Sequence, residues 1–322
     1  MRAMILAAGL GTRLLPLTNF RPKVLFPLRG VTMLDFWIDR LCRYGFDRAV
    51  VNAFHLKEEL GRTVSEKKQP LDVEVLYEPV LLGTGGGIIN ALDSLGDEPF
   101  VVINGDIICD APLDLLLRQH VESGSEVSLL LHDWSEFNNV AVDGNGSILG
   151  FGKDLEKLRQ GGLEFRRLAF TGIHFITPSA IKPYSSSPGE ILTVYRGLIA
   201  AGRPPKALFH NGLFWREMGS ISSYMALNSE LAGLAQEFIP PLCTGREITI
   251  DPDASVAGNA KLTGSVVVGR GARIAKNAIL ENTILWEDAQ IEEGTHLRNC
   301  IVSRGMRISG SHSDRVFVPE EK

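Results

Sequence analysis

The feature that most constrains the fold is a hydrophobic residue at every sixth position near the end of the chain. The period runs unbroken from Ile250 to Leu280, slips by one residue before Leu285 and again before Val302, and ends at Ile308. Neither an α-helix nor an alternating strand repeats in this way, and small or turn-forming residues fill the intervals. The repeat therefore predicts a stack of short coils. Its positions are Ile250, Val256, Leu262, Val268, Ile274, Leu280, Leu285, Ile291, Leu297, Val302 and Ile308.

This hexapeptide pattern resembles the left-handed parallel β-helix, in which three hexapeptides form one triangular coil. The repeats between residues 250 and 308 are enough for only about three to four coils. Because so short a stack leaves apolar coil ends to bury, we expect a homo-oligomer.

The rest of the chain predicts an α/β domain. Short apolar runs alternate with amphipathic stretches, as in the βαβ units of a Rossmann-like, mainly parallel sheet. We expect this α/β domain to cover residues 1–238 and the β-helix with a short tail to cover 239–322, separated near the prolines at 240 and 241. The expected strands are 2–7, 48–52, 73–77, 100–103, 127–131 and 172–176, and the expected helices are 33–44, 55–66, 85–95 and 113–123.

Composition excludes several classes of function. The 322 residues carry a net charge of −5, whereas a nucleic-acid-binding protein would show a basic excess. The apolar run Met4 to Ala8 is too short for a signal peptide, and no apolar run is long enough to span a membrane. We therefore expect a cytoplasmic protein with no nucleic-acid or membrane partner. The four cysteines and seven histidines are scattered and form no metal-binding motif.

The opening loop predicts a phosphate site. The expected strand ends at Ala7, and Ala8, Gly9 and Gly11 follow with Thr12 and Arg13 directly behind them. Residues without a Cβ atom let backbone N–H groups approach an anion closely. The loop lacks the third glycine of a dinucleotide-binding fingerprint and the lysine of a Walker A loop. Another cation, Lys23, comes ten residues after Arg13.

Two further loops carry related chemistry. A glycine-rich loop follows the strand that ends at Tyr77, running from Glu78 through Gly83 to the Gly85-Gly86-Gly87 triplet. Such a loop lets the backbone pass close to a flat base or a ribose. Asp106 lies just past the apolar strand that ends at Ile103, where a carboxylate is a natural ligand for Mg²⁺.

Taken together, the motif from Leu6 to Lys23 resembles that of the sugar-nucleotide pyrophosphorylases, which make NDP-sugars from an NTP and a sugar 1-phosphate. The resemblance implies catalytic roles for Arg13 and Lys23 and metal binding by Asp106. In the family's late W-x-D-x-G-T segment this chain has Glu217 in place of aspartate and Ser220 in place of threonine, so Glu217 is the expected second ligand of Mg²⁺. The nucleotide-binding residues that it implies are Ala8, Gly9, Gly11, Thr12, Glu78, Gly83 and Gly86.

The sugar side matches the family less well. The resemblance implies that Asn139, Lys153 and Gly172 bind the sugar phosphate. Asn139 stands in the family's Y-G-V segment, and the common E-K-P is replaced by Gly-Lys-Asp around Lys153. A solvated Lys153 is an equal alternative.

The substrate pair stays open at this stage. The tail favours guanylyl transfer from GTP to mannose 1-phosphate, whereas the second glycine loop and the Thr171-Gly172-Ile173 segment resemble those of uridylyltransferases for N-acetylmuramate 1-phosphate, and another hexose 1-phosphate is a further alternative. A non-catalytic, nucleotide-sugar-sensing subunit is an alternative of another class. An acyltransferase that uses His296 or His312 of the β-helix is disfavoured because the coils are few.

Overall fold

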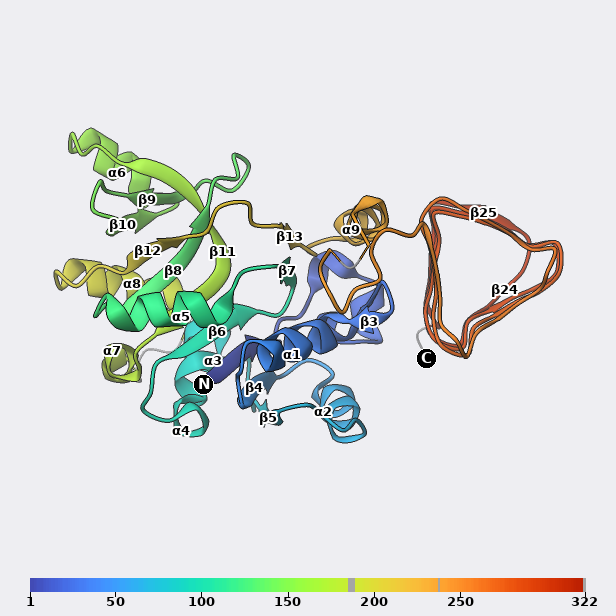
Figure 1. Cartoon of the computed structure of the whole chain (residues 1–322), viewed down its shortest axis with the longest axis horizontal. Coiled ribbons are helices and arrows are strands. Elements are labelled where there is room, and N and C mark those ends of the chain that lie inside the picture. The colour runs from blue at the N-terminus through green and yellow to red at the C-terminus, as the bar shows by residue number, and fades with distance from the viewer. Residues whose placement is uncertain (185–188, 237, 321–322) are drawn as a thin grey trace. The chain divides into compact units, whose positions relative to one another are not determined.

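The computed structural model describes residues 1–184, 189–236 and 238–320 (Figure 1). Compactness divides the chain into two units, and each is discontinuous in sequence. Unit 1 comprises Met1–Gly9 and Trp37–Arg216, and unit 2 comprises Leu10–Phe36 and Glu217–Lys322. The predicted boundary between residues 238 and 239 stays a prediction. Among the described residues, no helix is long and apolar enough to cross a membrane.

Unit 1 has the α/β architecture that the alternating pattern predicts. Its strands are β1 (Arg2–Leu6), β4 (Arg48–Ala53), β5 (Asp72–Tyr77), β6 (Phe100–Asn104), β7 (Ile107–Cys109), β8 (Val127–His132), β9 (Val140–Val142), β10 (Ile148–Phe151), β11 (Arg166–Ile176) and β12 (Lys206–Phe209), and β13 (Trp215–Glu217) runs across the unit boundary. Its helices are α2 (Lys57–Ser65), α3 (Gly83–Asn90), α4 (Leu92–Leu95), α5 (Leu113–Glu122), α6 (Asp154–Gln160), α7 (Pro178–Ile181), the 3₁₀ helix η4 (Lys182–Tyr184) and α8 (Ile191–Ala200), and α1 (Met33–Arg43) leads into the unit.

The sheet of unit 1 is mixed, with a parallel centre. Its order is β10-β9-β11-β6-β1-β4-β5, and β8 pairs with both β11 and β12. β1 is parallel to β4 and β6, whereas β11 is antiparallel to β6, β8 and β9. Met4, Val50 and Val102 lie side by side on these central strands and are fully buried, which places the core of the unit there. The carboxyl ends of β1, β4, β5 and β6 therefore meet at one edge.

Unit 2 combines the segment after the first glycine with the carboxyl-terminal part. It contains the 3₁₀ helices η1 (Thr12–Leu14), η2 (Leu17–Asn19) and η3 (Lys23–Leu25), the short hairpin β2 (Pro27–Leu28) and β3 (Val31–Thr32), and helix α9 (Ile221–Gly233). The coil strands are β14 (Ile248–Ile250), β15 (Ser255–Val256), β16 (Lys261–Thr263), β17 (Val266–Val268), β18 (Arg273–Ile274), β19 (Ile279–Glu281), β20 (Ile284–Leu285), β21 (Gln290–Ile291), β22 (His296–Arg298), β23 (Ile301–Val302), β24 (Arg307–Ile308), β25 (Ser311–Ser313) and β26 (Val316–Phe317).

These strands form the parallel β-helix that the hexapeptide repeat predicts. They stack into three parallel sheets, β14-β17-β20-β23-β26, β15-β18-β21-β24 and β16-β19-β22-β25, and Figure 1 shows the coils end-on as a triangle. The predicted inward positions from Val268 to Ile308 are buried. Ile250 is 44% exposed because it lies in the first coil, at the end of the stack.

The one-residue slip lies at a single corner of the triangle. Leu262 pairs with Leu280 on one face and Val267 with Ile284 on the next, so the second coil is one residue shorter between these faces. Successive coils turn this corner through Gly264, Asn282, Asn299 and Asp314, all with positive φ. Asparagine and aspartate tolerate this conformation better than most side chains. Their side chains also bond from coil to coil, with Asn299 donating to Asp314 at 2.9 Å.

Candidate functional site

A buried polar network lies at the carboxyl ends of β1, β4 and β5. The Oδ1 atom of Asn52 accepts a hydrogen bond from the N–H group of Ala7 at 2.7 Å, and its Nδ2 atom donates to Oε1 of Glu78 at 2.7 Å. The other carboxylate oxygen of Glu78 accepts from the N–H group of Leu82 at 3.2 Å. Both polar side chains are buried. The network therefore ties the opening loop to the second glycine loop, and its centre, Asn52, is a residue that our sequence analysis missed.

The second glycine loop begins α3 and is closely packed by its own unit. The N–H groups of Gly85 and Gly86 both donate to the carbonyl of Gly189, at 2.6 and 3.2 Å. A Cβ atom on Gly85 would lie 2.7 Å from that oxygen, and one on Gly87 would lie 2.8 Å from Nδ2 of Asn52. Close backbone packing therefore explains part of the triplet. The nucleotide-binding roles of Gly83 and Gly86 stay predictions.

The structure brings Gly172 against the motif that contains Asp106. Gly172 lies in β11 with φ +84°, where the pairing with β8 is irregular between Phe170 and His174. A Cβ atom there would lie 2.7 Å from Nδ2 of Asn104, the last residue of β6. Asp106 is half-buried two residues further on. A predicted metal ligand and a predicted sugar-binding residue are thus neighbours in unit 1.

Asn139 and Lys153 also come together, at the start of β9 and the end of β10. The carbonyl of Asn139 accepts from the N–H group of Gly152 at 2.7 Å, and exposed Lys153 follows at the start of α6. Asp154, which replaces the family's proline, accepts from the N–H group of Phe151 at 3.1 Å. Burial opposes ionisation of Asp154, but its bonds to Arg196 and Phe151 hold the pKa below its ordinary value. This aspartate therefore serves the local fold.

An aromatic cluster next to Gly172 was not predicted. The indole N–H group of Trp215 donates to the carbonyl of Thr171 at 2.7 Å. Around Trp215 lie the rings of His132, Trp134 and Phe137, with centroids 4.8 to 5.9 Å away. Burial lowers the pKa of His132, so this ring is neutral near pH 7. The only sequence signal was the density of aromatic residues between positions 132 and 137.

In unit 2, the opening loop has the left-handed turn that its glycines permit. Gly11 has φ +63° and precedes η1, which contains Thr12 and Arg13. A Cβ atom on Gly11 would lie 2.6 Å from Cγ2 of Thr18, whose hydroxyl donates to the Gly11 carbonyl at 3.0 Å. Thr18 lies within the motif from Leu6 to Lys23, and its contacts with Gly11 stabilise this turn. Lys23 is half-buried at the start of η3.

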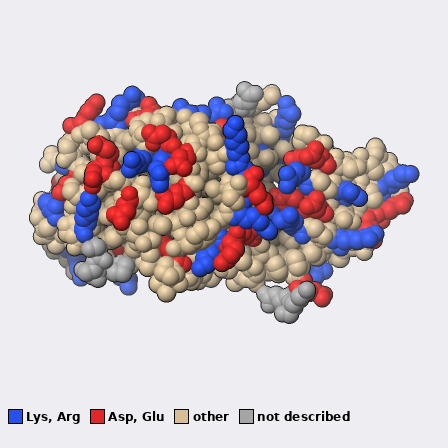
Figure 2. Space-filling model, turned by 90° about the horizontal axis from the view of Figure 1, so that it is seen from below, with Lys and Arg blue, Asp and Glu red and all other residues tan. Residues whose placement is uncertain are grey.

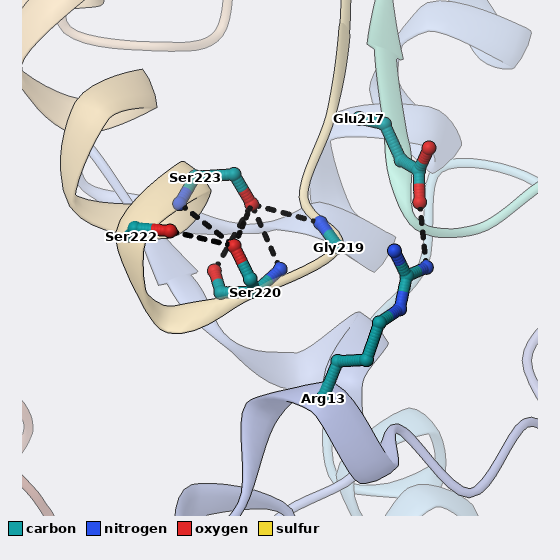
Figure 3. Close-up of polar contacts among 6 residues, drawn as sticks. All are labelled: Arg13, Glu217, Gly219, Ser220, Ser222 and Ser223. Atoms are coloured by element: carbon teal, nitrogen blue, oxygen red, sulfur yellow. Dashed lines mark hydrogen bonds and ion pairs between the residues drawn. The ribbon is translucent and has the colours of Figure 1, made fainter. Parts of the chain in front are cut away.

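Arg13 meets the late segment directly (Figure 3). Its Nη2 atom lies 2.9 Å from Oε1 of Glu217, and the two side chains are 69% and 25% exposed. Gly219 gives this pair its space, because a Cβ atom there would lie 2.7 Å from Oε1 of Glu217 and 3.0 Å from Nη1 of Arg13. A predicted catalytic residue and a predicted metal ligand are therefore in contact in unit 2.

The serine that replaces the family's threonine begins α9. The Oγ atom of Ser220 accepts from the N–H group of Ser223 at 3.1 Å, and Oγ of Ser223 accepts from the N–H group of Ser220 at 2.8 Å (Figure 3). This capping box satisfies N–H groups that the first helical turn leaves unpaired. Serine at position 220 thus keeps the local structure.

A magnesium ion is compatible with the donors that the sequence predicts. Within the ranges that the structure describes, no three histidine, cysteine or acidic side chains gather closely enough to enclose a metal ion. Magnesium is usually held by one or two carboxylates together with water and phosphate oxygens, rather than by a cage of protein ligands. The carboxylates of Asp106 and Glu217 are hard oxygen donors of this kind, and their metal roles stay predictions.

Comparison with known proteins defines the class of protein. The nucleotidyl transferase family matches residues 2–233, and the GMPPB C-terminal domain matches residues 244–313. The chain therefore belongs to the nucleotidyl transferase family, among the sugar-nucleotide pyrophosphorylases. Family members typically use a divalent metal.

Lysines and arginines are interspersed with acidic side chains over the face drawn in Figure 2.

Individual relatives are moderately similar. The chain is 28% identical to the mannose-1-phosphate guanylyltransferase of Mycobacterium tuberculosis, over 94% of this chain and 83% of that protein. It is 31% identical to the N-acetylmuramate alpha-1-phosphate uridylyltransferase of Caulobacter vibrioides, over 71% of this chain and 96% of that protein. The crystal structure of HddC from Yersinia pseudotuberculosis complexed with GMP-PN matches 70% of this chain and 97% of that chain, with a TM-score of 0.57 and 19% identity. The last likeness concerns the fold.

Proposed function

We propose that this chain transfers a nucleoside monophosphate from an NTP to a sugar 1-phosphate, with GTP and mannose 1-phosphate as the preferred pair. The observation that carries the reaction is the contact of Arg13 with Glu217 across Gly219. It joins the opening phosphate loop to the late carboxylate segment within unit 2. The exposed guanidinium is a planar fork suited to phosphate oxygens.

In the proposed reaction, a phosphate oxygen of the sugar 1-phosphate attacks the α-phosphorus of the NTP. The new phosphorus–oxygen bond forms as the bond to the β-phosphate breaks, and pyrophosphate leaves. Such transfer requires alignment and neutralisation of charge rather than covalent catalysis by the protein. Arg13 holds the departing phosphates, and Lys23 places a point charge against the α-phosphate and the attacking group. The arginine exchanges Glu217 for the triphosphate when the nucleotide binds.

The remaining predicted residues have supporting roles in this proposal. The backbone of Ala8, Gly9, Gly11 and Thr12 binds the triphosphate, and Glu78, Gly83 and Gly86 shape the position of the base and ribose. Asn139, Lys153 and Gly172 bind the sugar phosphate. Asp106 and Glu217 would each serve as a ligand for magnesium, which would supply further neutralisation of phosphate charge.

The choice of GTP and mannose 1-phosphate is supported by the domain combination. Similarity to a mannose-1-phosphate guanylyltransferase extends over 94% of the chain, and the GMPPB C-terminal domain matches the β-helix. Uridylyl transfer to N-acetylmuramate 1-phosphate is the second candidate. A relative of that name has the higher identity, 31%, over 71% of this chain.

A substrate panel tests the proposal. Purified protein with MgCl₂ is incubated with each common NTP and each of several hexose 1-phosphates, and pyrophosphate release is followed. We expect the highest kcat/KM for GTP with mannose 1-phosphate and no release by the Arg13→Ala variant. A preference for UTP with N-acetylmuramate 1-phosphate would select the second candidate. Tight binding of a nucleotide sugar with no pyrophosphate release from any pair would instead identify a sensing subunit.

We further propose that the chain forms a homo-oligomer in the cytoplasm. The proposal of an oligomer is supported by the end of the β-helix, where Ile250 is exposed and Val256 and Leu262 are only partly buried. Such apolar coil ends favour a second copy. Light scattering on the purified protein would give a single-chain mass if this is wrong.

A further inference from the structure

Lys23 lies within a short segment of unit 2 that is held at both ends by buried arginines. We call residues 21–29 the lysine segment. Arg21 is 6% exposed and Arg29 is 0% exposed, whereas Lys23 between them is half-buried. Arginine is almost never fully buried unless its charge and hydrogen bonds are satisfied. The two buried arginines of this nine-residue segment therefore require partners. The β-helix and the residues just before it supply these partners.

Arg21 is held by a corner of the β-helix. Its Nη1 atom donates to Oε1 of Glu287 at 3.1 Å, and its Nη2 atom lies 2.9 Å from Oε2 of the same carboxylate. Its guanidinium carbon lies 4.6 Å from the ring centroid of Trp286. Burial works to raise the pKa of Glu287, but the charge of Arg21 lowers it below its ordinary value. The carboxylate is thus ionised and paired at neutral pH.

Arg29 is held by main-chain carbonyls just before the β-helix. Its Nε atom donates to the carbonyl of Cys243 at 2.9 Å, Nη1 donates to that of Glu247 at 3.3 Å, and Nη2 donates to that of Arg246. Arg29 has φ +48°, a backbone conformation that is costly for a residue with a side chain. These bonds hold the turn between β2 and β3 in that conformation.

The middle of the lysine segment packs on the same corner. The ring of Phe26 meets Trp286 edge-on, with centroids 4.9 Å apart. The indole N–H group of Trp286 donates to the Tyr224 hydroxyl at 3.2 Å, and that hydroxyl donates to the carbonyl of Pro27. Arg21 and Phe26 therefore both contact Trp286, a single buried residue of the β-helix.

We infer that Arg21, through Glu287 and Trp286, is a positioning residue for Lys23, so that the β-helix acts in the nucleotidyl transfer itself. The inference rests on the proposed catalytic role of Lys23. The α-phosphate and the attacking oxygen must be aligned closely, and a displacement of about 1 Å can cost roughly 100-fold in rate. The backbone of Lys23 lies two residues from the Arg21 ion pair and three from Phe26, which leaves it little freedom to shift.

The test uses full-length variants that remove the ion pair between Arg21 and Glu287 without leaving one of its buried charges unpaired. Arg21→Met combined with Glu287→Leu removes both charges together, and Arg21→Lys keeps the charge but loses the planar fork. We expect the paired variant to lower kcat at least tenfold with less than a threefold change in the KM for the NTP, and Arg21→Lys to recover part of the loss. Arg307→Met, which breaks an exposed ion pair with Glu292 elsewhere on the β-helix, is the matched control and should keep wild-type kcat.

A double-mutant cycle separates positioning from general stability. If Arg21 acts through Lys23, adding the paired substitution to Lys23→Ala should change kcat by less than twofold, because the group being positioned is gone. A loss that multiplies fully with that of Lys23→Ala, or wild-type kcat in the paired variant, would overturn the inference.

Hydrogen exchange gives a readout that does not depend on turnover. The N–H groups of Leu25 and Phe26 donate to the carbonyls of Pro22 and Lys23 at 2.9 and 3.0 Å. We expect these amides to exchange at least tenfold faster in the paired variant and at the wild-type rate in Arg307→Met. Unchanged amide exchange rates in the paired variant would show that the ion pair between Arg21 and Glu287 does not hold the lysine segment. A wild-type protein that releases no pyrophosphate would refute the proposed function, and the exchange result would still decide whether the β-helix holds the lysine segment.

Discussion

At the scale of single residues, Gly219 controls how Arg13 meets Glu217. An alanine Cβ atom at this position would press on the ends of both side chains, which can move, so the fold should survive. We predict that Gly219→Ala lowers kcat/KM for the NTP about tenfold, or about 1.4 kcal/mol of transition-state stabilisation. The free energy of unfolding should change by less than about 1 kcal/mol, because the Arg13 side chain of the displaced ion pair is exposed.

Gly233→Ala is the matched control for that prediction. Gly233 is the last residue of α9, and a Cβ atom there meets no atom within 4 Å. Alanine at a helical site without strain stabilises a protein slightly, by about 0.4 to 1 kcal/mol, and should leave kcat/KM unchanged. Steady-state kinetics and urea unfolding of both variants provide the measurement. Equal kinetic effects from the two substitutions would contradict the role given to Gly219.

Single residues that belong to local motifs could be predicted from the sequence, whereas residues that depend on distant partners could not. A contiguous motif placed Arg13 beside its glycine loop, and a separate short motif identified Glu217, since each pattern is local. Asn52, Arg21 and Arg29 were missed because each depends on distant partners: Glu78, Glu287 and the carbonyl of Cys243. A polar residue in an apolar strand signals that a partner exists, but the sequence does not name the partner.

At the scale of elements, the strongest apolar runs were predicted within a few residues. Strands β1, β4, β5, β6 and β8 and helices α1, α2 and α5 match the expected ranges closely. Short strands such as β9, with three residues, carry too little pattern to be recognised. Helix α8 was omitted although its buried residues Ile191, Val194, Tyr195 and Leu198 have helical spacing, so this element could have been predicted.

Helix α5 gives the unit a pH-dependent stability. His120, on its buried face, lies 2.9 Å from Oγ of Ser128 and 3.3 Å from Oγ1 of Thr177. Burial lowers the pKa of His120 to about 4 from an ordinary value of 6.5. Between these two values the unfolded chain binds a proton that the folded chain does not, so stability falls as the pH falls from 6.5 towards 4. At pH 5, the lowered pKa of His120 reduces the free energy of unfolding by about 2 kcal/mol.

Urea unfolding at pH 7 and at pH 5 measures this effect. His174, which burial also leaves with a lowered pKa, of about 3, acts in the same direction. We therefore expect His120→Asn to remove only its own share, so that the variant loses less stability than the wild type between the two pH values. If both proteins lost the same free energy over this interval, His120 would not be neutral in the folded unit.

At the scale of the whole molecule, residues that are far apart in the sequence share one compact unit. Residues 10–36 belong to the same unit as the β-helix, and the boundary that the prolines at 240 and 241 predict near residue 238 stays a prediction. The reason is physical: Arg21, Phe26 and Arg29 bury themselves against residues 200 or more positions later. Local patterns cannot reveal contacts of that separation.

The same contacts predict that residues 1–238 do not make an independent enzyme. The Caulobacter vibrioides relative aligns over 96% of its own length with 71% of this chain. Here, truncation after residue 238 would remove Trp286 and Glu287 and expose Phe26. Loss of a buried aromatic side chain alone costs about 3 to 5 kcal/mol, which lowers Tm by roughly 10 °C in a protein of this size. We expect at least that fall in Tm and less than one hundredth of wild-type kcat.

Supplying residues 239–322 as a separate chain should restore part of the Tm and part of kcat. A truncated protein with wild-type Tm and turnover would show that the phosphate loop and Lys23 fold without the β-helix.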